Sequence, residues 1–201
     1  MSDRRLRELE QRWLATRDLD VERELVQARV RAGTLPRPRL LFAAYVGSVA
    51  AQRALGDRGF AEEPNLLTWV RGLGRGRLGR YPLLVRGAAA RAVGAAFALA
   101  QRELDGSTAP AEDVLLAELA TLLGHLEACR AGTAPPPLGE GSRLTLWTER
   151  LLRATAPEDV TKFAALLVDE VAKLLRGTLR HQRQALRQAL AESLTEWALA
   201  S

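Results

Sequence analysis

The sequence predicts an all-α fold of about ten helices, packed as antiparallel hairpins in a HEAT-like array or a helical bundle. Apolar residues recur at spacings of three and four along most of the chain, which is the period of an α-helix. The chain is also rich in Ala, Leu and Arg, which favour helices, and poor in β-branched residues, which favour strands. No alternating run of apolar and polar residues exceeds a few positions, so we expect no β-sheet.

Capping and helix-breaking residues divide the first third of the chain into short helices. We expect Ser2 to cap the first helix and Gly33 to end the second. A third helix opens at Pro36, and Ser48 caps a fourth that closes at Gly56. The apolar positions of the first two helices are Leu6, Leu9 and Trp13, then Val21, Leu25, Ala28, Ala32 and Leu35.

The middle of the chain predicts three further helices and a loop. A fifth helix begins in "EEPNLLTW", and a sixth runs roughly from Tyr81 to Leu104. Small residues on the sixth helix allow a neighbouring helix to approach closely, along a seam of Leu83, Gly87, Ala90, Gly94 and Phe97. The seventh carries Leu115, Leu119, Leu122, Leu126 and Cys129. A proline-rich loop follows at residues 132–142.

Three more helices are expected after this loop. Thr155 is the expected N-cap of the ninth helix, with Pro157 in its first turn. We expect Gly177 to end that helix and to separate it from an antiparallel tenth. The apolar residues of the three helices are Leu144, Trp147, Leu151 and Leu152 in the eighth, Val160, Phe163, Leu167, Val171 and Leu174 in the ninth, and Leu179, Leu186, Leu190, Leu194 and Trp197 in the tenth.

The length of the chain predicts one domain, residues 1–201, with possible lobes at 1–106 and 107–201. The first lobe is basic, with 19 basic and 12 acidic residues, and the second is weakly acidic, with 10 and 12. The tripeptide "EDV" recurs 46 residues apart. That period suits a HEAT or armadillo repeat, although similar capping chemistry in an Ala/Leu-rich chain produces the same pattern.

The N-terminal quarter of the chain contains the segments "LRELEQRW", "RVRAGTL", "AAYVG" and "ALG". On these segments, residues 6–56 resemble the opening of uncharacterised multi-helical proteins of myxobacteria and similar bacteria. The resembling residues are packing and capping residues. The resemblance therefore implies a multi-helical fold and no particular activity.

The segment "RGLGRGRLGRYP", residues 71–82, is the first candidate binding site. Glycines expose backbone N–H groups, and Arg71, Arg75, Arg77 and Arg80 supply forked donors near the expected start of the sixth helix, a combination suited to phosphate. Although the segment contains a literal G-x-G-x-x-G, the strands of a dinucleotide fold are missing from the pattern. The alternative is a solvated connector between two helices.

A second candidate is a basic stripe with residues spaced three and four apart: Lys173, Arg176, Arg180, Arg183 and Arg187. On one unbroken helix these side chains would share a face suited to RNA, a membrane surface or an acidic partner. If Gly177 ends the ninth helix, the stripe divides into two unrelated patches.

The sequence carries no recognisable catalytic or metal-binding motif, so we expect a protein that is not an enzyme and needs no cofactor. His125 and Cys129 are one helical turn apart, but zinc needs more ligands than this pair supplies. Arg86 and Arg91 interrupt the most apolar stretch, which favours a buried helix over a transmembrane segment. The absence of a secretory signal pattern at the N-terminus predicts a cytoplasmic location.

These features together predict a non-enzymatic helical scaffold or adaptor that binds another protein. The alternative is a nucleic-acid or polyphosphate binder that uses the Arg/Gly-rich segment, because the chain carries a net charge of +5. A small-molecule hydrolase whose residues converge only in the folded protein is the third candidate.

Overall fold

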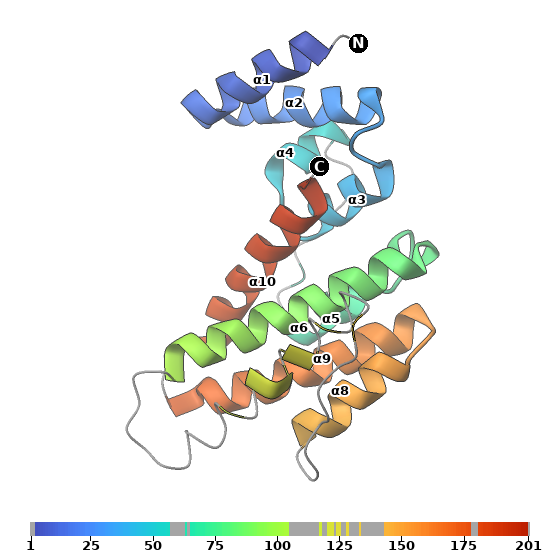
Figure 1. Cartoon of the computed structure of the whole chain (residues 1–201), viewed down its shortest axis with the longest axis vertical. Helices are drawn as coiled ribbons and strands as arrows, with labels where there is room; N and C mark the ends of the chain where they lie inside the picture. The colour runs from blue at the N-terminus through green and yellow to red at the C-terminus, as the bar shows by residue number, and fades with distance from the viewer. Residues whose placement is uncertain are drawn as a thin grey trace. The chain divides into compact units, whose positions relative to one another are not determined.

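The structure is a computed structural model, and it describes residues 3–56, 63, 65–104, 117, 120–122, 124–125, 128, 133, 143–177 and 181–200. Throughout these ranges the regular structure is helical and contains no strand, which confirms the predicted all-α fold. The elements are α1 (Asp3–Thr16), α2 (Leu19–Ala32), α3 (Arg37–Tyr45), α4 (Val49–Ala54), α5 (Leu66–Gly72), the 3-10 helix η1 (Leu78–Arg80), α6 (Pro82–Leu104), α8 (Arg143–Arg153), α9 (Pro157–Leu174), the 3-10 helix η2 (Leu175–Gly177) and α10 (Gln182–Leu199) (Figure 1).

The chain divides into two compact units. Unit 1 combines Met1–Glu62 with Leu194–Ser201, and unit 2 is Glu63–Ser193. Helix α10 therefore contributes its first turns to unit 2 and its last turns to unit 1. The HEAT-like arrangement and the lobes at 1–106 and 107–201 stay predictions.

Local capping sets the helix boundaries of unit 1, at the predicted Gly33 and Ser48 and at Asp18, which was not predicted. Asp18 caps α2 by accepting hydrogen bonds from the backbone N–H groups of Asp20 and Val21, at 2.7 and 3.1 Å. These bonds favour the ionised carboxylate and lower the pKa of Asp18. Gly33 ends α2 with a left-handed φ of 76°, and Ser48 caps α4. The predicted cap of α1, Ser2, lies outside the described residues.

The end of α10 completes unit 1. Arg29 and Arg39 donate to the carbonyl oxygens of Leu199 and Ala200, at 3.2 and 2.7 Å. These bonds satisfy acceptors that the end of a helix leaves free. The Trp197 ring packs edge-on against Phe42, with 6.2 Å between centroids, and the guanidinium of Arg39 lies over the same ring.

Helix α9 forms the centre of unit 2. It packs against α5, α6 and α8, and Figure 1 shows α6 and α8 running beside it. Because α9 has neighbours on several sides, its buried residues cover more than one stripe: Val160, Thr161, Ala164, Ala165, Leu167, Val168, Val171 and Ala172. Many of them are small, which lets the neighbouring backbones approach closely.

The buried face of α6 differs from the predicted seam. Leu83 is 82% exposed, and Gly87, Ala90 and Gly94 are only partly buried, whereas Phe97 is buried as predicted. Besides Phe97, the buried residues of α6 are Val85, Ala88, Ala89, Ala92, Val93, Ala96, Leu99, Ala100 and Leu104. Since α6 is apolar on nearly all sides, periodicity alone does not identify which face meets α9. The expected close approach is provided by alanines rather than glycines.

The start of α9 corrects a second prediction, and its end confirms a third. Ala156, not Thr155, is the N-cap, because Pro157 occupies the first helical position and the cap must precede it directly. Helix α9 ends at Leu174 and continues only as the 3-10 helix η2 through Gly177. The predicted break between the ninth and tenth helices is therefore confirmed.

Helix α6 is long and apolar enough to cross a bilayer by length and composition. Half of its most apolar window lies buried inside the protein. Among the described residues no other helix meets this test. A buried core helix and a membrane span satisfy it equally, so the predicted lack of a transmembrane segment stays a prediction.

Substitution Trp197→Ala tests whether the end of α10 holds unit 1 together. It removes the contacts with Phe42 and Arg39, so we expect the free energy of unfolding to fall by about 2 kcal/mol. Urea denaturation followed by far-ultraviolet circular dichroism measures this decrease. Glu196→Ala, at the neighbouring exposed position, is the control and should change stability by less than about 0.5 kcal/mol. Equal effects of the two substitutions would contradict the described packing.

Candidate binding surfaces

The Arg/Gly-rich segment forms the connection between α5 and α6. Helix α5 ends at Gly72, a turn follows, η1 spans Leu78–Arg80, and α6 begins at Pro82. The prediction of a connector is therefore confirmed. The connector is not fully solvated, however, because Leu73 and Leu78 are buried within unit 2.

Two of the glycines in this connection are required by close packing. A Cβ at Gly74 would lie 2.5 Å from both the carbonyl oxygen of Pro157 and the hydroxyl oxygen of Thr161. A Cβ at Gly79 would lie 2.4 Å from the carbonyl oxygen of Gly74. Gly76 has open space around it, but its φ of +55° is one that L-residues rarely adopt. Gly74 thus lets the turn pack on the start of α9, Gly79 lets the turn close on itself, and Gly76 supplies its left-handed backbone.

The hydroxyl of Thr161 joins α9 to the end of α5. It is buried and lies 3.2 Å from the carbonyl oxygen of Arg71, 3.1 Å from that of Pro157 and 3.2 Å from that of Glu158, so these three acceptors share one donor. The Nε of Arg71 is buried without a hydrogen-bond partner among the described residues. Arg71 is therefore held in the packed part of the connection, apart from the exposed turn.

The other three predicted anion-binding residues are exposed. The side chains of Arg75, Arg77 and Arg80 make no hydrogen bond or ion pair with any residue that the structure describes. Three uncompensated guanidinium groups within six residues make this turn locally basic. The structure thus separates Arg71 from the remaining three and leaves those three available to an anion.

The predicted basic stripe is not continuous, because the α-helix ends between its first two members. Lys173 lies on α9, Arg176 on η2, and Arg183 and Arg187 on α10, while Arg180 lies outside the described residues. The break confirms the alternative in which the stripe divides. The side chains of Lys173, Arg183 and Arg187 instead bind partners within unit 2.

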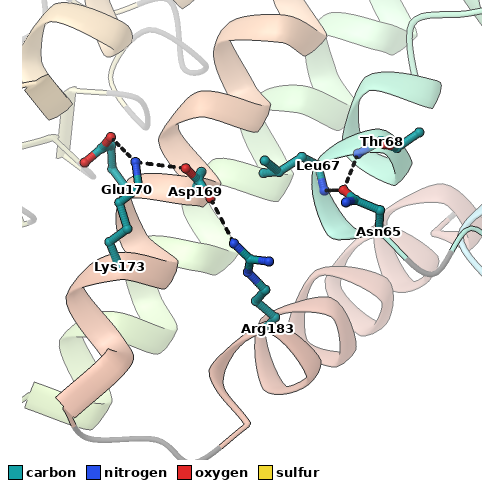
Figure 2. Close-up of polar contacts among 7 residues, drawn as sticks. All are labelled: Asn65, Leu67, Thr68, Asp169, Glu170, Lys173 and Arg183. Atoms are coloured by element: carbon teal, nitrogen blue, oxygen red, sulfur yellow. Dashed lines mark hydrogen bonds and ion pairs between the residues drawn. The ribbon is translucent and has the colours of Figure 1, made fainter.

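Lys173 and Arg183 bind the carboxylates of α9 (Figure 2). The ammonium of Lys173 is 2.9 Å from Asp169 and 2.8 Å from Glu170, and the guanidinium of Arg183 is 3.7 Å from Asp169. Figure 2 shows Arg183 of α10 reaching across to α9. Hydrogen bonds to Glu170 and then Asp169 raise the pKa of Lys173. These residues form an internally neutral network that supports the fold.

Arg187 also has a structural partner. Its guanidinium donates to the carbonyl oxygen of Glu63 and lies over the ring of Trp69, 5.5 Å from the centroid. Nearby, Asn65 caps α5 by accepting from the N–H groups of Leu67 and Thr68, at 3.0 and 3.1 Å (Figure 2). Arg187 therefore ties the segment that leads into α5 to α10.

A third surface, which the sequence analysis did not identify, lies on the solvent side of α8. The apolar residues Leu144 and Leu151 and the buried Thr148 face inward, and α8 packs on α9. The outward residues are Arg143, Leu146, Trp147, Arg150 and Arg153, which we term the α8 outer face. Leu146 is 43% exposed and Trp147 is half-buried.

Trp147 is fixed between two helices. Its ring stacks on Phe163 of α9, with 6.1 Å between centroids and 22° between planes. The guanidinium of Arg150 lies over the Trp147 ring, 5.2 Å from the centroid. The α8 outer face therefore presents an exposed leucine and a rigid tryptophan among three arginines. The useful sequence signal was the spacing of Arg143, Arg150 and Arg153, which places all three on one side of α8.

His125 is buried, and its proposed neighbour Cys129 lies outside the described residues. No group of three or more His, Cys, Asp or Glu side chains is placed to hold a metal ion within the part of the chain that the structure describes.

Comparison with family models, with curated proteins and with solved structures finds no match for this chain. The predicted resemblance to myxobacterial proteins in the N-terminal quarter accordingly stays a prediction.

Gly74→Ala tests the packing of the turn on α9. The added methyl group meets a backbone carbonyl that cannot move cheaply, so we expect the free energy of unfolding to fall by about 3 kcal/mol. Gly76→Ala is the matched control, and its left-handed backbone should cost only about 1 kcal/mol. Thermal or urea denaturation measures both. A smaller effect of Gly74→Ala than of Gly76→Ala would show that the turn does not approach α9 this closely.

Lys173→Met tests the carboxylate network through pH. Because the raised pKa favours charged lysine in the folded state, its stabilisation is complete below the ordinary value of 10.5 and disappears as pH rises through the higher folded value. We expect the variant to be less stable than wild type at neutral pH, with a gap in urea midpoint that closes only above pH 10.5. Arg176→Met is the control, because arginine stays charged across this range. A gap that closes below pH 10.5 would contradict the network.

Proposed function

We propose that the protein is a helical scaffold or adaptor and that it binds another protein through the α8 outer face. The observation that carries the proposal is the pairing of exposed Leu146 with half-buried Trp147 beneath Arg150. Tryptophan and arginine are the residues that most often dominate the binding energy of protein interfaces.

The rigidity of this surface supports the same proposal. Trp147 is held by Phe163, so its side chain gives up little further entropy when a partner binds. The ring is set beside an exposed apolar side chain and is surrounded by charged groups. An apolar centre with a polar rim is the arrangement typical of protein interfaces.

A photo-crosslinking amino acid in place of Leu146 tests the proposal in cells that naturally make the protein. We expect a discrete adduct that is sensitive to protease, resistant to nuclease, and abolished when Trp147→Ala is combined with the probe. The control places the same probe at Gln184, an exposed position on α10. No adduct from position 146, or the same adducts from both positions, would refute the proposal.

A second function is supported by a separate observation, the three exposed arginines of the α5–α6 turn. The side chains of Arg75, Arg77 and Arg80 have no partner among the described residues and suit a nucleic acid or a polyphosphate. Replacing all three by alanine should weaken binding to a generic duplex. It should also flatten the slope of log affinity against log salt by roughly 0.9 for each phosphate that the variant no longer neutralises.

The control for this experiment replaces three exposed arginines of unit 1, Arg5, Arg12 and Arg37, by alanine. The change in net charge is then the same in both variants. Equal slopes for the two triple variants, or no binding by wild type at low salt, would exclude the turn as an anion site.

A further inference from the structure

We infer that the protein segment bound by the α8 outer face is acidic, with aspartate or glutamate side chains around a central apolar residue. This inference rests on the proposed function and specifies the chemistry of its partner. It follows from the charges on α8, from the small apolar centre between them, and from the contacts that already cover Trp147.

The charges on and beside the α8 outer face are predominantly positive. Arg143 and Arg153 have side chains that are 77% and 81% exposed, and Arg150 is exposed as well. The single carboxylate on α8 is Glu149, which lies 3.4 Å from Arg153. Glu170 of α9 approaches Arg143 only to 4.0 Å and is shared with Lys173. Arg150 has no carboxylate partner among the described residues, so the face retains positive charge that carboxylates of a partner can neutralise.

The apolar part of the face is small and central. Leu146 lies one helical turn from both Arg143 and Arg150, so its exposed side chain is flanked by guanidinium groups. A partner that supplied only apolar groups would bury these charges without compensation, which is costly. A partner with one apolar residue between carboxylates satisfies Leu146 and the arginines together.

The same contacts argue against a single-stranded nucleic acid that stacks its bases on this face. Base stacking needs a free aromatic surface. The Trp147 ring is stacked on Phe163 and has Arg150 over it, while Leu146 offers no ring. They also argue against a bilayer. An interfacial helix must insert a broad apolar face, and the apolar side of α8 is already packed on α9.

Selection from a displayed library of random peptides, each about four helical turns long, tests the inference directly. The library is selected on the full-length wild-type protein and, in parallel, on the Arg143→Gln, Arg150→Gln, Arg153→Gln triple variant. We expect peptides selected on wild type to be enriched in Asp and Glu around an apolar residue, and those selected on the triple variant to lack this enrichment. Synthetic copies should bind the triple variant and Trp147→Ala roughly thirtyfold more weakly than wild type.

Two further variants separate charge effects from damage to the fold. Replacing Arg5, Arg12 and Arg37 by glutamine makes the same change in net charge on unit 1 and should leave peptide affinity unchanged. Glu149→Gln removes the carboxylate that competes for Arg153, so it should tighten binding of the acidic peptides severalfold. A gain in affinity cannot result from unfolding, and its absence would count against the inference.

The outcomes distinguish this inference from the proposed function. Neutral or basic peptides whose binding is abolished by Trp147→Ala would overturn the acidic partner and leave a protein-binding α8 face in place. Selected peptides whose binding ignores every α8 substitution would overturn both. A single-stranded oligonucleotide or a phosphatidylserine vesicle that binds more tightly than the peptides, and binds the triple variant weakly, would overturn the inference and assign this face to phosphate.

Discussion

The burial of α9 against several neighbours is the constraint on which unit 2 depends. Small residues such as Ala164 and Ala165 let α6 lie close along α9. At the start of α9, Gly74 brings the α5–α6 turn within contact of Pro157 and Thr161. Each of these contacts needs a missing or short side chain. The fold therefore tolerates little added volume along α9, whereas the outward faces of its neighbours are free to vary.

This constraint also explains where binding groups can occur. Helix α8 buries Leu144, Thr145, Thr148 and Leu151, and its exposed positions lie on the opposite side of the helix. Those positions hold arginines around Leu146 and Trp147, and the ring of Trp147 is fixed by Phe163. The candidate surface is thus rigid because the core beneath it is rigid. In contrast, Lys173 and Arg183 are occupied by carboxylates of α9 and serve the fold.

Local features were predictable from the sequence, and relations between distant segments were not. Gly33 and Ser48 were identified because a glycine in a left-handed conformation and a side-chain cap act within a few residues. The seam of α6 was misplaced, as exposed Leu83 shows, because an Ala-rich helix is apolar on almost every side. The α8 outer face was missed for a related reason. Trp147 was assigned to the apolar stripe, and only its contact with Phe163, sixteen positions along the chain, places it at the surface edge.

Native-state hydrogen exchange in increasing urea tests the central role of α9 most directly. Amides of the most deeply packed helix exchange only when the whole unit opens, whereas peripheral helices open at lower free energy. If α9 is the centre of unit 2, the amides of Ala164–Ala172 are the most protected in that unit and α8 exchanges earlier. Exchange of α9 before α6 or α8 would contradict this central role, because those helices would then hold together without the element on which they are described as packing.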